Sequence, residues 1–222
     1  MKITSDTKIY AGTNEIKKVY KGTDLIYEQT STPYTALNYI QSTGTQYINA
    51  MLPNYTAGFT VELKYEFTEE RNNQFMWGAE GNSPYNRNYF KRNRVNSLEV
   101  GAYWYNSIND YTQIGTVYEA IVKTLRNIEQ SLTLDGTTVW STTSYISYDR
   151  TNLTPYIFAL NGRGTASENA SMKLYYIKFY DKDNNLLRDL IPVLDLNNVP
   201  CLYDKVSQTF FYNAGSGTFL YG

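Results

Sequence analysis

Four consecutive blocks near the carboxyl end decide the fold: Lys173-Leu-Tyr-Tyr-Ile-Lys-Phe-Tyr180, Leu186-Leu-Arg-Asp-Leu-Ile-Pro192, Cys201-Leu-Tyr-Asp204 and Phe210-Phe-Tyr-Asn-Ala-Gly-Ser-Gly-Thr-Phe219. The first two are rich in aromatic and branched side chains, which fit a half-buried pleated sheet. The polar segment Asp181-Lys-Asp-Asn-Asn185 separates them, so the pattern predicts two strands joined by a turn. We therefore expect the carboxyl end to belong to the fold and not to form a tail.

The rest of the chain after Pro33 also predicts one strand after another. Besides 173–180 and 186–191, the predicted strands are 47–51, 59–67, 75–79, 97–105, 118–126, 131–134, 137–140 and 156–159. No segment carries a helical period over three turns. Asp135-Gly136 is the two-residue signal of a type I′ hairpin, because both turn positions need a positive φ that Asp and Gly tolerate. The sequence predicts an all-β fold.

One further block, Tyr39-Ile-Gln-Ser-Thr-Gly-Thr-Gln-Tyr-Ile48, lies near the start of the same region. Together with the carboxyl-terminal blocks it resembles the laminin-G-like, or concanavalin A-like, jelly-roll domains of tail and fibre proteins of gut bacteriophages and of some gut bacterial surface proteins. The resemblance implies a jelly-roll sandwich over residues 35–222, with the last strands beside the first. Such sandwiches host lectins, glycosidases and scaffolds, so the fold alone leaves the function open.

The chain before Pro33 holds a short internal repeat, Ile9-Tyr-Ala-Gly-Thr-Asn-Glu-Ile16 and then Val19-Tyr-Lys-Gly-Thr-Asp-Leu-Ile26. Each copy predicts a strand, a Gly-containing turn and a strand, or about three short strands in all, a core too small to be stable without a partner surface. Residues 1–30 resemble N-terminal β-modules of gut phage fibres, which implies docking on the virion or oligomerisation. An extra sheet folded onto its own jelly roll is the alternative. Residues 31–34 are the expected linker.

The composition and the net charge argue against several classes of function. The 222 residues include 23 Tyr, carry a net charge of −1 and contain no His. The charge offers no basic field for nucleic acid or anionic membranes, and the absence of His removes imidazole relays and imidazole metal ligands. The single cysteine, Cys201, cannot form an intrachain disulfide and is expected in the core. The chain start lacks the apolar run of a signal peptide, and no segment is long enough to span a membrane.

The best match to a glycosidase motif is Glu62-x-Lys64-x-Glu66 within the strand predicted at 59–67. Strand alternation places both acids and Lys64 on one face, with Val61 and Leu63 on the other. Two residues four positions apart on a strand stand about 13 Å apart, beyond the roughly 5 to 9.5 Å of a catalytic carboxylate pair. We therefore interpret this as a solvated strand face and do not expect an enzyme, although acids from distant strands could still converge.

The densest group of sugar-binding residue types lies between Trp77 and Asp110. Lectins stack aromatic rings on sugars and satisfy hydroxyls with Asn, Asp or Arg, and loops of this kind suit the rim of a rigid sandwich. The candidate carbohydrate-binding residues are Tyr85, Tyr89, Arg92, Tyr103, Tyr105 and Asn106. The alternative interpretation is that tyrosine-rich strands simply cover the outside of the protein. Laminin-G-like relatives often hold calcium at one rim, and Asn109 and Asp110 are the residues that would supply oxygen ligands.

The resemblance and the binding residues together indicate a bacteriophage virion protein, a fibre or similar appendage exposed on the particle. Its N-terminal module would contact other virion proteins, and its jelly roll would bind a host surface glycan for adhesion. A homo-oligomer, with a trimer by analogy to other phage fibres, would strengthen weak sugar sites. Two alternatives stay open: a decoration or assembly protein that binds no sugar, and a bacterial surface lectin or glycosidase.

Overall fold

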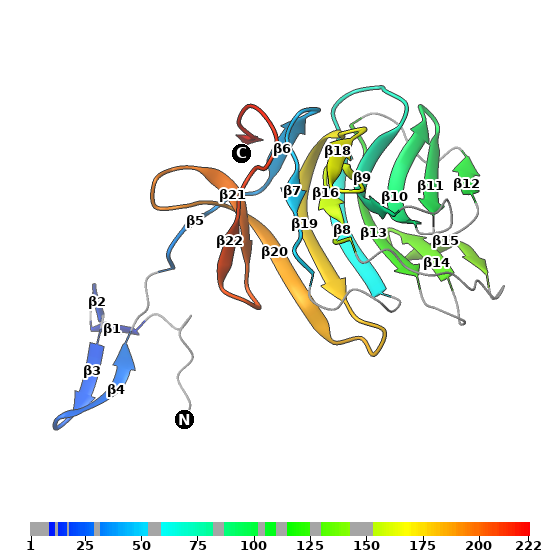
Figure 1. Cartoon of the computed structure of the whole chain (residues 1–222). Coiled ribbons are helices and arrows are strands. Elements are labelled where there is room, and N and C mark those ends of the chain that lie inside the picture. Colours follow the sequence, from blue (N-terminus) through cyan, green and yellow to red (C-terminus); the bar gives the residue numbers. More distant parts are fainter. Residues whose placement is uncertain are drawn as a thin grey trace. The chain divides into compact units, whose positions relative to one another are not determined.

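The structure is a computed structural model that describes residues 9–11, 13–16, 18–28, 32–52, 59–81, 87–101, 105–109, 115–124, 130–142 and 153–222. Within these ranges every regular element is a β-strand (Figure 1). Contacts along the chain divide it into two compact units, Met1–Thr35 and Ala36–Gly222.

The smaller unit consists of two antiparallel hairpins. β1 (Ile9–Ala11) pairs with β2 (Asn14–Ile16), and β3 (Lys18–Lys21) pairs with β4 (Asp24–Glu28). The repeat therefore forms four strands, one more than the sequence predicted, because each copy closes its own hairpin. Tyr20 and Ile26 are each 54% exposed.

The larger unit contains two sheets. The eleven-stranded sheet has the order β15-β14-β13-β8-β19-β20-β21-β22, and β5, β6 and β23 also belong to it. Its strands are β5 (Thr35–Ala36), β6 (Ile40–Thr43), β8 (Phe59–Phe67), β13 (Val117–Thr124), β14 (Gln130–Leu134), β15 (Thr137–Thr142), β19 (Ser171–Tyr180), β20 (Leu186–Leu194), β21 (Pro200–Asp204), β22 (Thr209–Phe211) and β23 (Leu220–Tyr221).

The eight-stranded sheet has the order β12-β11-β10-β9-β16-β7. In addition, β17 pairs with β9, and β18 pairs with β17. Its strands are β7 (Ile48–Asn49), β9 (Gln74–Glu80), β10 (Arg87–Arg94), β11 (Ser97–Gly101), β12 (Tyr105–Asn109), β16 (Tyr156–Ile157), β17 (Leu160–Gly162) and β18 (Thr165–Ser167). The sequence predicted one strand over 97–105, but the structure ends β11 at Gly101 and starts β12, its hairpin partner, at Tyr105.

The inner faces of the two sheets form one core. In β8, alternation buries Val61, Leu63, Tyr65 and Phe67, as the sequence predicted. Tyr65 packs edge-on against Phe90 of the other sheet, with ring centroids 5.9 Å apart, and Trp77 packs against Phe179 at 6.5 Å. Burying each such side chain contributes roughly 1.5–3 kcal/mol, so the contact between sheets holds the sandwich together. The all-β sandwich predicted from the sequence is confirmed.

The two sequence blocks at opposite ends of the larger unit meet in space. The Ser216 amide donates to Thr45 O at 3.2 Å, and the Ala214 amide donates to Tyr47 O at 2.8 Å. A Cβ built on Gly215 would lie 2.2 Å from Thr45 O, so only glycine permits this approach. β23 then pairs with β6, which places the last strand beside the first strands of the sandwich.

The hairpin between β14 and β15 gives a direct stability prediction. Asp135 has a φ of 45° and Gly136 a φ of 79°, which confirms the type I′ turn. We expect Gly136→Ala to lower the free energy of unfolding by about 1 kcal/mol, because a Cβ disfavours the left-handed conformation. Urea denaturation of the full chain measures this. The neighbouring exposed Thr137→Ala is the control, and equal stability of the Gly136 variant and the wild type would contradict the turn assignment.

Candidate functional site

Most of the sugar-binding residues predicted from the sequence lie where the structure does not describe their side chains. Tyr85, Tyr103 and Asp110 are outside the described residues. Tyr105, Asn106 and Asn109 belong to β12, whose backbone pairs with β11, but their side chains are not described. These residues stay predictions.

Tyr89 lies on strand β10, although the sequence predicted a loop at this position. Its side chain is 3% exposed and packs against Phe75, with ring centroids 5.1 Å apart. Its hydroxyl donates to Oε1 of Glu99, a fully buried carboxylate that also lies 3.8 Å from the Lys91 ammonium. A ring covered in this way cannot stack on a sugar, so Tyr89 is a packing residue of the smaller sheet.

Arg92, the other predicted site residue with a described side chain, is fully buried. Its guanidinium donates to Glu69 O at 3.1 Å and to Val95 O at 3.0 Å, and it lies over the Phe67 ring. These backbone carbonyls occupy the donors that an acidic sugar would need. Arg92 therefore holds the turn before β9 in place and does not face solvent.

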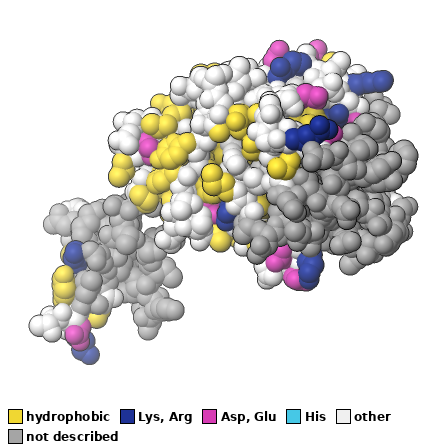
Figure 2. Space-filling view, in the orientation of Figure 1, with side chains coloured by type: hydrophobic (Ala, Val, Ile, Leu, Met, Phe, Trp, Pro, Cys, Tyr) yellow, Lys and Arg dark blue, Asp and Glu magenta, His cyan; other side chains and the backbone are white. Residues whose placement is uncertain are grey.

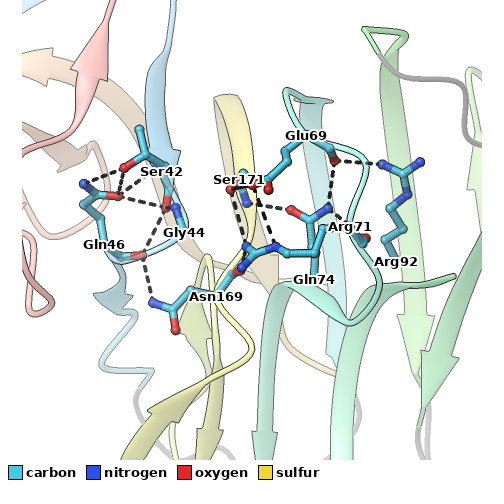
Figure 3. A network of polar contacts seen from close by, with 10 residues as sticks. Ser42, Gly44, Gln46, Glu69, Arg71, Gln74, Arg92, Asn169 and Ser171 are labelled. Atoms are coloured by element: carbon cyan, nitrogen blue, oxygen red, sulfur yellow. Dashed lines mark hydrogen bonds and ion pairs between the residues drawn. The ribbon is translucent and has the colours of Figure 1, made fainter. Parts of the chain in front are cut away.

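The contacts of Arg92 belong to a polar network at one end of the sandwich (Figure 3). Gln74 accepts a hydrogen bond from the Ser171 amide at 2.7 Å, and the Ser171 hydroxyl donates to Glu69 at 2.7 Å. Asn169 then donates to Gln46 O at 3.3 Å. The network joins the β6–β7, β8–β9 and β18–β19 connections, so its polar groups bind one another and fix this rim.

A different surface, the outer face of the eleven-stranded sheet, combines half-buried aromatic and polar groups. A β-bulge interrupts the pairing of β19 with β8: Leu174 pairs with Tyr65 and Tyr176 pairs with Lys64, and Tyr175 is the extra residue. Leu174 and Ile177 are buried, whereas both tyrosines are half-buried. A bulge changes the direction in which the side chains of a strand point, and bulges are common next to active sites. Two successive tyrosines thus reach the same outer face.

Each glutamate of β8 on this face binds one lysine and one tyrosine of β19. The Glu66 carboxylate lies 3.2 Å from Lys173 Nζ and accepts a hydrogen bond from the Tyr175 hydroxyl at 2.7 Å. The Glu62 carboxylate lies 3.2 Å from Lys178 Nζ and accepts from the Tyr180 hydroxyl at 3.3 Å. The alternation predicted for Glu62, Lys64 and Glu66 is confirmed, and both carboxylates are already paired.

The lysines of this surface also lie over its aromatic rings. Lys173 Nζ is 5.0 Å from the Tyr39 ring centroid, Lys178 Nζ is 5.1 Å from that of Tyr176, and Lys64 Nζ is 5.6 Å from that of Tyr175. Such contacts restrain both partners. We call this surface the tyrosine face and define it by Tyr39, Tyr175, Tyr176, Tyr180, Glu62, Lys64, Glu66, Lys173 and Lys178.

The surroundings of Tyr175, Tyr176 and Tyr180 raise the pKa of each of their hydroxyls. Desolvation by burial, followed by the hydrogen bond to Glu66, raises the pKa of Tyr175 to about 12. Desolvation and the nearby Glu62 carboxylate also raise the pKa of Tyr176 and of Tyr180. The Tyr175 and Tyr180 hydroxyls therefore donate to Glu66 and Glu62, and their lone pairs can accept from an incoming hydroxyl group.

No group of three or more Cys, Asp or Glu side chains among the described residues could hold a metal ion. Cys201 is buried, as predicted, and burial raises the pKa of its thiol to about 12. No helix within the described ranges has the length and apolar character needed to cross a bilayer.

Comparison with known proteins supports the fold. No protein-family model and no curated protein matches the sequence. The structure is similar to that of a candidate carbohydrate-binding protein from Bacteroides ovatus ATCC 8483, with a TM-score of 0.63 and 12% identity over 91% of this chain. The present chain spans 64% of that one, less than two thirds. At this identity the likeness shows the concanavalin A-like sandwich fold alone, and it confirms the predicted fold class.

A sialidase from Trypanosoma rangeli in complex with sialic acid is a weaker match. Its TM-score is 0.41 at 11% identity, and the match covers 74% of this chain and 33% of the sialidase. A similarity of this size carries no functional argument.

Proposed function

We propose that the larger unit binds carbohydrate through the tyrosine face. The observation that carries this proposal is the bulge at Tyr175, which presents Tyr175 and Tyr176 together beside the paired carboxylates of Glu62 and Glu66. Tyrosine is suited to such a role because one end of the ring is apolar and the other is polar. The fold that the chain shares with a candidate carbohydrate-binding protein supports the proposal.

The geometry suits a weak sugar site. Half-buried rings offer flat apolar surface to sugar C–H groups, and their contacts with lysines and carboxylates hold them in one orientation. Rings restrained before binding lose little conformational entropy when a ligand arrives. If several copies of the chain are linked, binding by one copy brings the site of the next copy to the glycan at an effective concentration of about 1 mM or more.

We further propose that binding occurs without turnover. Both carboxylates of the tyrosine face already interact with a lysine ammonium and a tyrosine hydroxyl, so neither is a free acid or base. The expected result is that no new reducing ends form when the chain is incubated with a polysaccharide that it retains.

The setting that we propose is an exposed bacteriophage appendage, as the sequence resemblance implies. The smaller unit, with Tyr20 and Ile26 exposed, would dock on other virion proteins or on further copies of the chain, with a trimer as the proposed state. A bacterial surface lectin would use the same tyrosine face. Electron microscopy of purified particles labelled with an antibody against the chain distinguishes these two settings.

An exposed apolar patch favours a second candidate function, assembly through protein contacts. Leu196 is 80% exposed, and Val199 and Tyr212, which both hydrogen-bond to Asp195, are 41% and 46% exposed. Figure 2 shows hydrophobic side chains gathered over β20, β21 and the loop between them. Surfaces of this kind often contact other proteins.

A binding screen with the full chain tests the first candidate against the second. Chains clustered on beads are applied to a glycan array and to intact gut bacteria, with and without a chelator. Saturable binding to defined glycans is the expected result. Loss of binding in the presence of the chelator would indicate that a calcium ion takes part. Absence of binding to every glycan and every cell would contradict carbohydrate binding and favour assembly through the apolar patch.

A further inference from the structure

Each lysine of the tyrosine face is paired with a carboxylate, which bears on the class of glycan that the face accepts. The three lysines that lie over its rings are each within ion-pair distance of a glutamate: Lys173 with Glu66 at 3.2 Å, Lys178 with Glu62 at 3.2 Å, and Lys64 with Glu119 at 3.4 Å. Glu119, on the neighbouring strand β13, supplies the third carboxylate, so each lysine over the rings has a negatively charged partner.

The two inner carboxylates are less exposed than an ordinary surface ion pair. The side-chain exposure is 16% for Glu66 and 25% for Glu62, and that of their lysine partners is 24% and 30%. Solvent screens such a pair less than a fully exposed one. Each carboxylate also accepts a tyrosine hydroxyl, so its position beside the rings is held by two partners from β19.

An anionic sugar placed on these rings would meet fixed carboxylates, and the three ammonium groups that lie over the rings are already paired with them. A uronate or sulfate could reach Lys173 or Lys178 only by displacing a glutamate that then remains close by. Like charges held near each other oppose binding, and this is a common route to specificity. A neutral sugar needs only hydroxyl-to-hydroxyl and C–H-to-ring contacts, which leave the ion pairs intact.

We propose that Glu62 and Glu66 make the tyrosine face selective for neutral glycans, by pairing the lysines beside the rings and repelling uronate, sialylated and sulfated chains. The inference rests on the carbohydrate binding proposed above. It assigns to these two glutamates the role of specificity residues.

Retention of the full chain in gels that contain a polysaccharide tests the inference. The neutral probes are dextran, yeast mannan and galactomannan, and the anionic probes are alginate and polygalacturonate, each at low and at physiological salt. We expect the wild type to be retained at least tenfold more strongly by one or more neutral probes than by either anionic probe, with little dependence on salt.

The variants Glu62→Gln and Glu66→Gln remove one negative charge each and free a lysine beside a ring. We expect the ratio of anionic to neutral retention to rise about tenfold, with a new sensitivity to salt. Asp183→Asn is the matched control, because it also removes one charge and frees a lysine, Lys182, at 2.6 Å in the β19–β20 turn, where no ring contact is involved. Circular dichroism confirms that each variant is folded.

The outcomes separate the inference from the proposed function. Wild-type retention that is equal or stronger on anionic probes would overturn the neutral selectivity while carbohydrate binding stands. The neutral selectivity is also overturned if the ratio of anionic to neutral retention rises no more in Glu62→Gln and Glu66→Gln than in Asp183→Asn. If no polysaccharide in the panel retains the wild type and the glycan screen is also negative, carbohydrate binding fails, and the selectivity fails with it.

Discussion

Gly215→Ala is expected to lower the free energy of unfolding of the larger unit by about 3 kcal/mol, at the upper end of the usual cost of overpacking. The new Cβ would lie 2.2 Å from Thr45 O and 3.0 Å from the Tyr47 ring. Because Thr45 O is a backbone atom that also accepts from the Ser216 amide, it cannot move without breaking that hydrogen bond. Thermal unfolding followed by circular dichroism should show a loss of roughly 6–12 °C for a unit of this size.

Gly162→Ala is the matched control for this prediction. The nearest atom to a Cβ on Gly162 is 3.6 Å away, an ordinary contact, and its backbone φ does not require glycine. We expect a change within about 0.5 kcal/mol. If Gly215→Ala unfolds at the temperature of Gly162→Ala, the close packing of residues 213–219 on residues 43–47 is not present in solution.

The same contact explains why the sequence predicts the sandwich well. The blocks that carry the family resemblance are those in which backbone meets backbone, as at Gly215 and Thr45, so their residue types are restricted by geometry. Asp204, at the end of another block, is fully buried and accepts the Ser207 hydroxyl at 2.6 Å and the Asp189 amide at 2.8 Å, which fixes the turn after β21. The alternation of β8 is equally clear, because one of its faces is core and the other is charged.

Strand β10 could not be predicted, because its side chains resemble those of a loop. Arg92 is fully buried and Lys91 and Asn88 nearly so, each a residue type that is usually exposed. Arg92 is tolerated because the backbone carbonyls of Glu69 and Val95 accept its donors, and Glu69 lies 23 residues earlier, before the neighbouring strand β9. Periodicity within the strand holds no information about the Glu69 contact, so Tyr89 and Arg92 were predicted on an exposed rim.

The tyrosine face was missed for a related reason. The sequence shows the alternation of Glu62, Lys64 and Glu66, but not that Lys173 and Tyr175 lie across from them, more than 100 residues away. One signal was available: the adjacent pair Tyr175-Tyr176 breaks the alternation of an otherwise regular strand. Such a break indicates a bulge only when the neighbouring strand is known.

The double variant Tyr175→Ala/Tyr176→Ala is expected to weaken the retention of neutral polysaccharide by about 100-fold. Each ring is expected to contribute about tenfold, or roughly 1.4 kcal/mol, as central aromatic contacts commonly do in binding sites. Gel retention with the best neutral probe measures the loss. Tyr175→Phe removes the hydroxyl and keeps the ring, so it distinguishes their contributions to binding. Because the stacking surface remains, we expect this variant to retain most of the binding.

Tyr212→Ala is the control for this prediction. Tyr212 is 46% exposed and its hydroxyl donates to Asp195 at 3.1 Å, but it belongs to the apolar patch and not to the tyrosine face. We expect its binding to equal that of the wild type. Loss of binding in Tyr212→Ala together with full binding in the double variant would move the sugar site to the apolar patch.

Hydroxyl-radical footprinting of the full chain, with and without a saturating neutral polysaccharide, shows whether the tyrosine face is the surface that binds sugar. Tyrosine is reactive in this experiment, so the peptide that contains Lys173–Tyr180 reports on the tyrosine face. We expect binding to protect Tyr175 and Tyr176 from oxidation. Protection confined to residues 82–86 and 101–110, with residues 173–180 oxidised as in the free chain, would contradict it.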